Sequence, residues 1–180
     1  MPVRDAARWL DEAMASLLAQ SFEDFEVVAV DDGSTDATPD LLGAWSERDE
    51  RVRVLRRPAR GIVAALEDGR RASRGPYIAR MDADDVAHPD RLARQLALLE
   101  AEPEMAACGT GVRYVPPDQV RAGARRYERW INGVVTPHDI AASIFVECPL
   151  AHPTLFMRAD VLDEVGGYRD TPWPEDYDLA

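Results

Sequence analysis

The sequence predicts an α/β fold with a largely parallel sheet flanked by helices, and three observations lead to this prediction. Short apolar runs rich in β-branched residues alternate with segments of helical periodicity. Two of the apolar runs end directly in acidic residues, as expected for strands whose carboxyl ends bind a ligand. The chain has 180 residues, of which 46% are hydrophobic, so it can build one domain with a substantial core.

The first hundred residues carry the alternating pattern most clearly. Leu10, Met14 and Leu17 recur at helical spacing and predict a helix over residues 6–20, with Asp5 as its N-cap. Residues 25–30 form an apolar run that predicts a buried strand. The further elements expected in this part are a helix opened by Thr38 and Pro39, a strand at 52–55, a helix at 62–72, a strand at 77–81 and a helix from Pro89.

The pattern is looser beyond residue 104. One or two strands are expected within 106–115, and the polar, arginine-rich stretch 116–133 is expected to be a loop or a mobile segment. The remaining expected elements are a short helix at 137–145, a strand at 154–157 and a helix over 159–165 that is stopped by Gly166 and Gly167.

Composition excludes several classes of function. The chain has 33 acidic and 21 basic residues, and a net charge of −12 disfavours binding to nucleic acid, which relies on a basic surface. No apolar run approaches the ~20 residues that a transmembrane helix needs. Cys108 and Cys148 have neither metal-binding nor redox spacing, so a cytoplasmic location is expected. Trp9 and Trp45 lie on apolar helix faces and are predicted to belong to the core.

The two acidic runs are the main candidates for chemistry. Asp31 and Asp32 follow one predicted strand, and Asp82, Asp84 and Asp85 follow another. Strand ends of one sheet can bring these carboxylates together, where they would repel one another unless a cation is present. Hard oxygen ligands suit Mg²⁺ or Mn²⁺, which completes its coordination shell with phosphate oxygens and water. The arrangement therefore implies a ligand that carries phosphate.

Each of these features also has an ordinary structural explanation when it is taken alone. Either acidic run could be a turn or the cap of the next helix, and Glu175-Asp176 could be a simple helix start. His152 is expected to be a packed loop residue. Ten of the 21 arginines fall between Arg48 and Arg80, where they could bind a diphosphate or lie on a solvated surface. A glycine-rich phosphate loop is absent, which weakens an ATPase or a dinucleotide-binding interpretation.

Four motifs occur in a recognisable order along nearly the whole chain. The motifs are 20–26 (Gln-Ser-Phe-Glu-Asp-Phe-Glu) with 30–36 (Val-Asp-Asp-Gly-Ser-Thr-Asp), 77–85 (Tyr-Ile-Ala-Arg-Met-Asp-Ala-Asp-Asp) with 89–92, His152-Pro153-Thr154, and Gly166-Gly167-Tyr168 with 175–179 (Glu-Asp-Tyr-Asp-Leu). Together they resemble the family 2 inverting glycosyltransferases, because their order and spacing are those of the family.

The resemblance implies a GT-A fold, which binds a nucleotide-sugar together with Mn²⁺ or Mg²⁺. By this resemblance, Asp32 would accept a hydrogen bond from the uracil N3–H, with Asp31 beside it. Asp82 would lie near the ribose, and Asp84 would hold the metal that bridges the diphosphate. Asp176 would be the general base, and Glu175 would contact the acceptor substrate.

The resemblance also divides the chain and describes its partners. Residues 1–100 would form the nucleotide-sugar-binding half, and 101–180 the acceptor half of a single domain. The donor would by default be a UDP-sugar, and the acceptor a carbohydrate or a lipid-linked molecule used in cell-surface polysaccharide or glycoconjugate synthesis. The protein would be cytoplasmic, or peripheral at the inner face of the plasma membrane. The first strand and the C-terminal part of the family domain are expected to be missing.

Two other interpretations remain open at this stage. A sugar-1-phosphate nucleotidyltransferase shares the fold type and the metal, but it should carry a glycine-rich loop with a basic residue after its first strand. The other alternative is an inactive fragment or a pseudoenzyme that binds nucleotide without transferring sugar.

Overall fold

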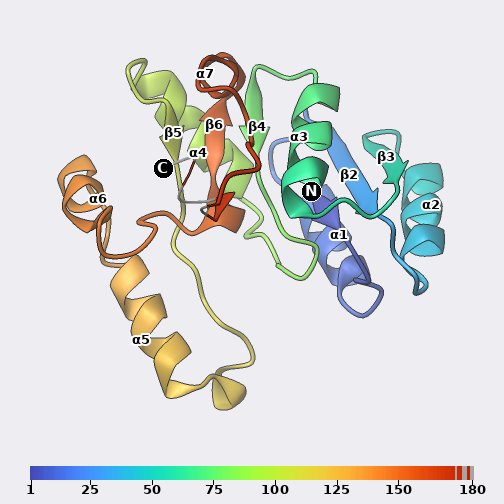
Figure 1. Cartoon of the computed structure of the whole chain (residues 1–180), viewed down its shortest axis with the longest axis horizontal. Helices are drawn as coiled ribbons and strands as arrows, with labels where there is room; N and C mark the ends of the chain where they lie inside the picture. The colour runs from blue at the N-terminus through green and yellow to red at the C-terminus, as the bar shows by residue number, and fades with distance from the viewer. Residues whose placement is uncertain (173, 176–177, 179–180) are drawn as a thin grey trace.

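The computed structural model describes residues 1–172, 174–175 and 178. Strands and helices alternate through its first hundred residues, which confirms the predicted α/β class (Figure 1). The elements of this part are β1 (Pro2–Val3), α1 (Leu10–Leu18), β2 (Val27–Asp32), α2 (Thr38–Arg48), β3 (Val52–Arg57), α3 (Ile62–Ala72), β4 (Tyr77–Ala79) and α4 (Arg91–Ala101). The later elements are β5 (Ala107–Cys108), the 3-10 turn η1 (Pro117–Gln119), α5 (Ala122–Ile131), α6 (Pro137–Ser143), the 3-10 turn η2 (His152–Thr154), β6 (Phe156–Arg158) and α7 (Ala159–Glu164).

The first three strands form the predicted parallel sheet, in the order β1-β2-β3. All six residues of β2 are buried, and their side chains alternate between two layers of helices. Val27 and Ala29 pack in one cluster with residues of α1 and α2, whereas Val28 and Val30 pack with Ala65 of α3. This sandwich of helices around β2 is the main core of the molecule.

The other three strands form a second sheet in the order β4-β6-β5, and its pairs are antiparallel. Tyr77 lies opposite Arg158, and Ala107 lies opposite Met157. The sequence pattern did not predict this reversal. It arises because η2 delivers the chain beside the end of β4, where the amide of Arg80 donates to the carbonyl of Leu155 at 2.8 Å. β6 therefore runs back along β4.

Two side chains that were predicted to cap helices are used elsewhere. Helix α1 begins at Leu10 rather than after Asp5, whose Oδ1 accepts from the backbone amide and the hydroxyl of Thr35. Helix α2 already includes Thr38, and the Thr38 Oγ1 accepts from the amide of Ala6 at 2.8 Å. Both side chains hold the segment after β1 against the loop after β2, a long-range contact that local sequence signals do not reveal.

An apolar cavity of about 470 Å³ lies between β2 and β4. Val27, Val28 and Tyr77 line it, because β1 is too short to separate the two strands over their whole length. The amino group of Met1 is buried at this cavity and donates to the carbonyl of Val28 at 2.9 Å. Burial and, to a smaller extent, the charge of Arg80 lower the pKa of this amine to about 5.

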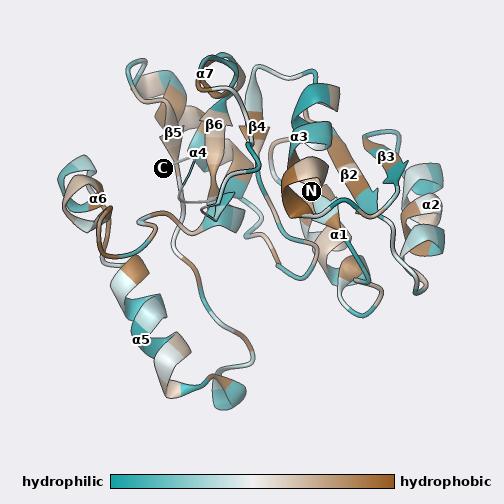
Figure 2. Cartoon of the chain, in the orientation of Figure 1, coloured by the Kyte–Doolittle hydropathy of each residue, from teal (hydrophilic) through white to brown (hydrophobic). Residues whose placement is uncertain are grey.

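The stretch 112–147, here called the arm, lies apart from both sheets at one end of the molecule (Figure 1). The expectation of a loop at 116–133 is wrong, since this stretch contains η1 and helix α5. In α5 only Ile131 is buried, and its apolar residues Ala124, Tyr127 and Ile131 stand among charged ones, so the stretch has the composition of a polar loop (Figure 2). The predicted strands at 106–115 reduce to β5.

Other local predictions are confirmed. Gly166 and Gly167 end α7 with positive φ angles of 91° and 69°, and the amide of Gly167 donates to the carbonyl of Leu162. Cys108 and Cys148 are buried and are not joined in a disulfide. Within the part of the chain that the structure describes, no helix combines the length and the apolar character that a membrane crossing requires.

Candidate active site

The first acidic run lies at the carboxyl end of β2, as predicted, and its two side chains have different surroundings. Asp31 Oδ1 accepts from the amide of Ser34 at 3.0 Å and stabilises the turn that follows the strand. Asp32 accepts from the amides of Arg60 (2.7 Å) and Gly61 (2.9 Å), one on each carboxylate oxygen. Asp32 therefore anchors the loop between β3 and α3, and the remaining lone pairs of its oxygens stay open to a further donor.

The turn after these aspartates requires a glycine. Gly33 has a φ angle of +70°, which side-chain-bearing residues rarely adopt. A Cβ atom at this position would lie 2.7 Å from the backbone nitrogen of Ala59. The close approach of the two backbones places the loop before Gly61 directly beside the end of β2.

The second acidic run follows β4 and is anchored by a buried arginine. Arg80 is only 4% exposed, and its NH1 donates to Asp82 Oδ2 at 2.5 Å. Asp84 is exposed. Burial raises the pKa of Asp85, and the negative charges of Asp82 and Asp84 raise it further. The carboxylates of this run are thus close enough to repel one another, and a bound cation would relieve that repulsion.

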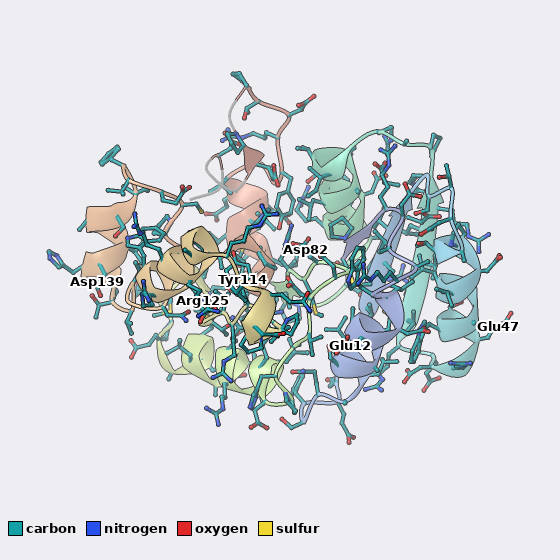
Figure 3. The ribbon with its side chains drawn as sticks, turned by 90° about the horizontal axis from the view of Figure 1, so that it is seen from below. Glu12, Glu47, Asp82, Tyr114, Arg125 and Asp139 are labelled. Carbon is teal, nitrogen blue, oxygen red and sulfur yellow. The ribbon has the colours of Figure 1, made fainter. Side chains whose placement is uncertain are left out.

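The structure brings the two acidic runs together at one cavity of about 270 Å³. Asp32 from the first run and Asp82 and Asp84 from the second run line it, whereas Asp31 does not. In Figure 3, Asp82 lies between the side of the molecule that carries Tyr114 and Arg125 and the side that carries Glu12 and Glu47. The expectation that the two strand ends meet is therefore confirmed for three of the five aspartates: Asp32, Asp82 and Asp84.

Arg4 and Trp9 also line this cavity, although neither was predicted as a site residue. Arg4 follows β1, and its NH1 lies 3.6 Å from Asp32 Oδ2 while half of its side chain remains exposed. Trp9 also lines the cavity and is 42% exposed, so the prediction of a core position for Trp9 is wrong. A signal for Arg4 was present, because it stands at the carboxyl end of a strand, the edge at which such sheets bind ligands.

The arginine-rich stretch 48–80 has a largely structural role. Most of its guanidinium groups pair with carboxylates outside the cavity, including both Arg70 and Arg71 with Glu67. Arg80 differs, because its guanidinium group pairs with the cavity residue Asp82. The other arginines of this stretch that form ion pairs are Arg51, Arg53, Arg57, Arg60 and Arg74.

The C-terminal motif is described only in part. Asp176 lies outside the described residues, but Glu175 is described, and its Oε1 lies 3.7 Å from His152 Nδ1. His152 is buried, as predicted, and burial lowers its pKa to about 3. Tyr168 donates its amide to Glu67 Oε2 at 3.2 Å, and burial raises the pKa of its hydroxyl to about 12. The motifs at 152–154, 166–168 and 175 thus meet in one place.

The cavity carboxylates fit a divalent cation of a particular kind. Among the described residues, no group of three or more His, Cys, Asp or Glu side chains is arranged to hold a metal ion by itself. Mg²⁺ is usually held by one or two carboxylates together with substrate phosphates, and Asp82 and Asp84 supply that number of oxygen ligands at an open cavity. The residues present therefore suit an ion that arrives with a phosphate-bearing ligand.

Comparison with known proteins identifies the family. The sequence profile of glycosyl transferase family 2 matches residues 1–166, which is most of the chain. The chain belongs to this family. It is 29% identical over 179 residues to an uncharacterized glycosyltransferase of Haemophilus influenzae, with 96% of this chain and 55% of that protein aligned. It is 30% identical over 184 residues to EpsE of Bacillus subtilis, a glycosyltransferase by its name, with 99% of this chain and 63% of EpsE aligned.

Two solved structures have a similar fold. The mannosyltransferase PcManGT of Pyrobaculum calidifontis, in complex with GDP-Man and Mn²⁺, matches with a TM-score of 0.72 at 21% identity, covering 98% of this chain and 48% of that one. TarS 1-349 of S. aureus, in complex with UDP-GlcNAc, matches with a TM-score of 0.75 at 19% identity, covering 98% of this chain and 49% of that one. The chain has the GT-A fold and spans about half the length of the proteins it matches.

Proposed function

We propose that this chain is the nucleotide-sugar-binding and catalytic part of a metal-dependent, inverting glycosyltransferase. The observation that carries the proposal is the cavity at which Asp32, Asp82 and Asp84 meet, in a chain that belongs to glycosyl transferase family 2. Residues 1–100 bind the donor in this proposal, and residues 101–180 face the acceptor. Most of the cavity lining comes from the first of these halves, which supports the division.

The donor is a nucleoside diphosphate sugar, with a UDP-sugar as the default. Asp32 accepts from the N3–H of the base through the lone pairs that Arg60 and Gly61 leave open, and Asp31 supports it by holding the turn. Asp82 lies near the ribose, and Arg80 keeps its carboxylate in place. The similar fold of proteins that bind GDP-Man and UDP-GlcNAc supports this class of donor.

Asp84 is the proposed ligand of Mn²⁺ or Mg²⁺, because its carboxylate is exposed at the cavity. When bound, such an ion neutralises the negative charge that develops on the departing diphosphate. PcManGT, which shares the fold, is in complex with Mn²⁺. The repulsion among Asp82, Asp84 and Asp85 supports a cation at the same place.

On the acceptor side, Asp176 is the proposed general base, and Glu175 binds the acceptor. Asp176 takes the proton from an acceptor hydroxyl while that oxygen attacks the anomeric carbon from the face opposite the diphosphate. A single displacement of this kind inverts the anomeric centre and needs only one base. Replacing Asp176 by Asn should leave donor affinity unchanged and lower turnover by ~10²–10⁴, the usual contribution of a general base.

The acceptor in this proposal is a carbohydrate or a lipid-linked molecule used to build a cell-surface polysaccharide or glycoconjugate, and the protein works at the cytoplasmic face of the membrane. The surface of the arm supports this location. Between residues 113 and 129 it carries five arginines and two acidic residues, in a chain whose net charge is −12. Phe145 and Val146 on the same arm are 97% and 73% exposed, as expected of a surface that meets an acidic lipid layer.

A donor screen tests the proposed function. The protein is incubated with a panel of nucleotide-sugars and Mn²⁺, and release of nucleoside diphosphate is measured. We expect release from at least one donor and loss of that release when Mn²⁺ is chelated. Nucleotide binding without consumption of any donor would identify a pseudoenzyme. Pyrophosphate release from a sugar-1-phosphate and a nucleoside triphosphate would identify a nucleotidyltransferase.

A further inference from the structure

Two buried side chains behind the candidate site each keep one nitrogen without a hydrogen-bond partner among the described residues. They are Nε of Arg80 and Nε2 of His152. Arg80 and His152 are 4% and 7% exposed, so water does not simply replace the missing partners. Because buried polar atoms without partners are costly, residues that keep them often serve a function.

The backbone brings these two residues close together. Arg80 follows β4, and its amide donates to the carbonyl of Leu155 at 2.8 Å. The amide of Leu155 in turn donates to the carbonyl of His152 at 3.2 Å, which closes η2. The positive charge of Arg80 acts on the His152 ring and also on the hydroxyl of Tyr168, whose ring centroid lies 6.0 Å from that of His152. Arg80, His152 and Tyr168 therefore form one buried cluster.

Each end of this cluster reaches a carboxylate of a different motif. At one end, Arg80 NH1 donates to Asp82 Oδ2, which lines the donor cavity. At the other end, His152 Nδ1 lies 3.7 Å from Glu175 Oε1, slightly beyond a direct hydrogen bond. Contacts of this kind are often long in an empty site and shorten when substrate binds. The cluster thus connects the donor side with the acceptor side of the site.

The charge state of His152 decides what the ring can do. Burial, together with the nearby cation of Arg80, lowers its pKa to about 3, so the ring is neutral at physiological pH and carries one proton. The carboxylate of Glu175 beside Nδ1 favours the tautomer that has this proton on Nδ1. Nε2 is then an acceptor, and Arg80, whose guanidinium has donors only, lies nearby.

We propose that His152 is a positioning residue, which donates from Nδ1 to Glu175 and so holds Glu175 at a set place relative to Asp82. Arg80 holds Asp82 from the same cluster. This role rests on the proposed function, because it assumes that Glu175 and Asp176 serve the acceptor. It explains why a histidine, rather than an apolar residue, occupies a buried position in η2.

The first test measures the tautomer directly and needs no enzymatic activity. In ¹⁵N-labelled protein, long-range ¹H–¹⁵N correlation spectra distinguish Nδ1–H from Nε2–H rings, and the His152→Asn spectrum assigns the signal against the exposed His88 and His138. We expect a neutral His152 with its proton on Nδ1 throughout pH 5–8. A proton on Nε2, or a charged ring within this range, would overturn the proposal whether or not the protein transfers sugar.

The second test uses matched substitutions. The side-chain nitrogen of Asn can replace Nδ1–H, that of Gln replaces the Nε2 position, and Leu replaces neither. We expect His152→Asn to keep most of the turnover, and His152→Gln and His152→Leu to lower kcat about tenfold or more, the loss expected for one hydrogen bond to a charged group. UDP affinity with Mn²⁺ should stay unchanged in all three. Equal kcat losses in His152→Asn and His152→Leu would indicate packing alone and contradict the role of Nδ1.

Discussion

The first hundred residues and the arm are built in opposite ways. Around β2, the side chains of Leu10, Met14 and Leu42 are completely buried, and acidic side chains hold each loop at the strand ends. In the arm, α5 buries only Ile131, and Phe145 is 97% exposed. The carboxylates that we propose to bind the nucleotide are thus held in fixed positions, whereas the arm leaves apolar and basic side chains exposed. In our proposal the donor site is built within the first hundred residues, and the arm is a surface for a partner.

The largest expected effect concerns Asp84, the proposed metal ligand in the first hundred residues. Asp84→Ala should reduce Mn²⁺-dependent UDP affinity by about a hundredfold or more, because an oxygen ligand and its charge are lost together. Asp85→Ala is the matched control, and it should reduce UDP affinity less if Asp85 only supports the second acidic run. Titration calorimetry with UDP and Mn²⁺ measures both. Equal affinities in wild type and Asp84→Ala would remove Asp84 from the site.

The next effect compares the stability of the two regions. Leu42→Ala empties a fully buried position and should lower the free energy of unfolding by about 2–5 kcal/mol. Phe145→Ala removes a larger but exposed side chain from the arm and should cost less than about 0.5 kcal/mol. Urea unfolding of both variants measures the difference. A comparable loss in Phe145→Ala would mean that the arm packs against something in solution.

A pH-dependent effect probes the cavity between β2 and β4. The unfolded chain keeps the proton on the Met1 amine up to about pH 8, whereas the folded chain releases it above about pH 5. The folded state therefore gains stability as pH rises from 5 to 8, and Tm should rise by several degrees. His152 adds to this rise in stability only below pH 6.5, which is the ordinary pKa of a histidine side chain. Acetylation of the Met1 amine should abolish the part of this rise in Tm that occurs above pH 6.5. An unchanged dependence of Tm on pH would contradict this account.

The same cavity makes a short N-terminal extension informative. About six added residues with β-branched side chains would replace the charged amine by an amide and place apolar atoms between β2 and β4. We expect such a chain to melt at a higher temperature and to bind less of a hydrophobic dye than the chain of 180 residues. A polar extension of equal length is the control, and it should give the smaller gain in Tm.

The smallest expected effect tests the arm as a surface for a partner. A triple variant that replaces Val135, Phe145 and Val146 by Ser removes side chains that are each at least 73% exposed. Folding and UDP affinity should not change, while the acceptor KM should rise several-fold, up to about tenfold. Steady-state kinetics at saturating donor separates the two parameters. An unchanged acceptor KM would place acceptor recognition outside the exposed part of the arm.

The sequence by itself determined the parallel sheet, the helices on its two faces, the acidic runs at the ends of β2 and β4, and the family. These features depend on local information, because periodicity, strand-end residues and motif order can be counted along the chain. The helix at 62–72 and the glycine stop after α7 were predicted for the same reason. Helix α6 of the arm was predicted, but α5 was not, because its apolar residues stand among arginines and the stretch has the composition of a polar loop.

Only the tertiary structure decided which side chains work together. Asp5 and Thr38 hold loops instead of capping helices, and the antiparallel second sheet depends on where η2 meets β4. Arg4 reaches Asp32, and Arg80 shares a buried cluster with His152, across separations at which sequence patterns carry no information. The physical reason is that the donors, acceptors and charges of a site are matched through space. A linear pattern can name the residues that carry the chemistry, but folding decides what each of them contacts.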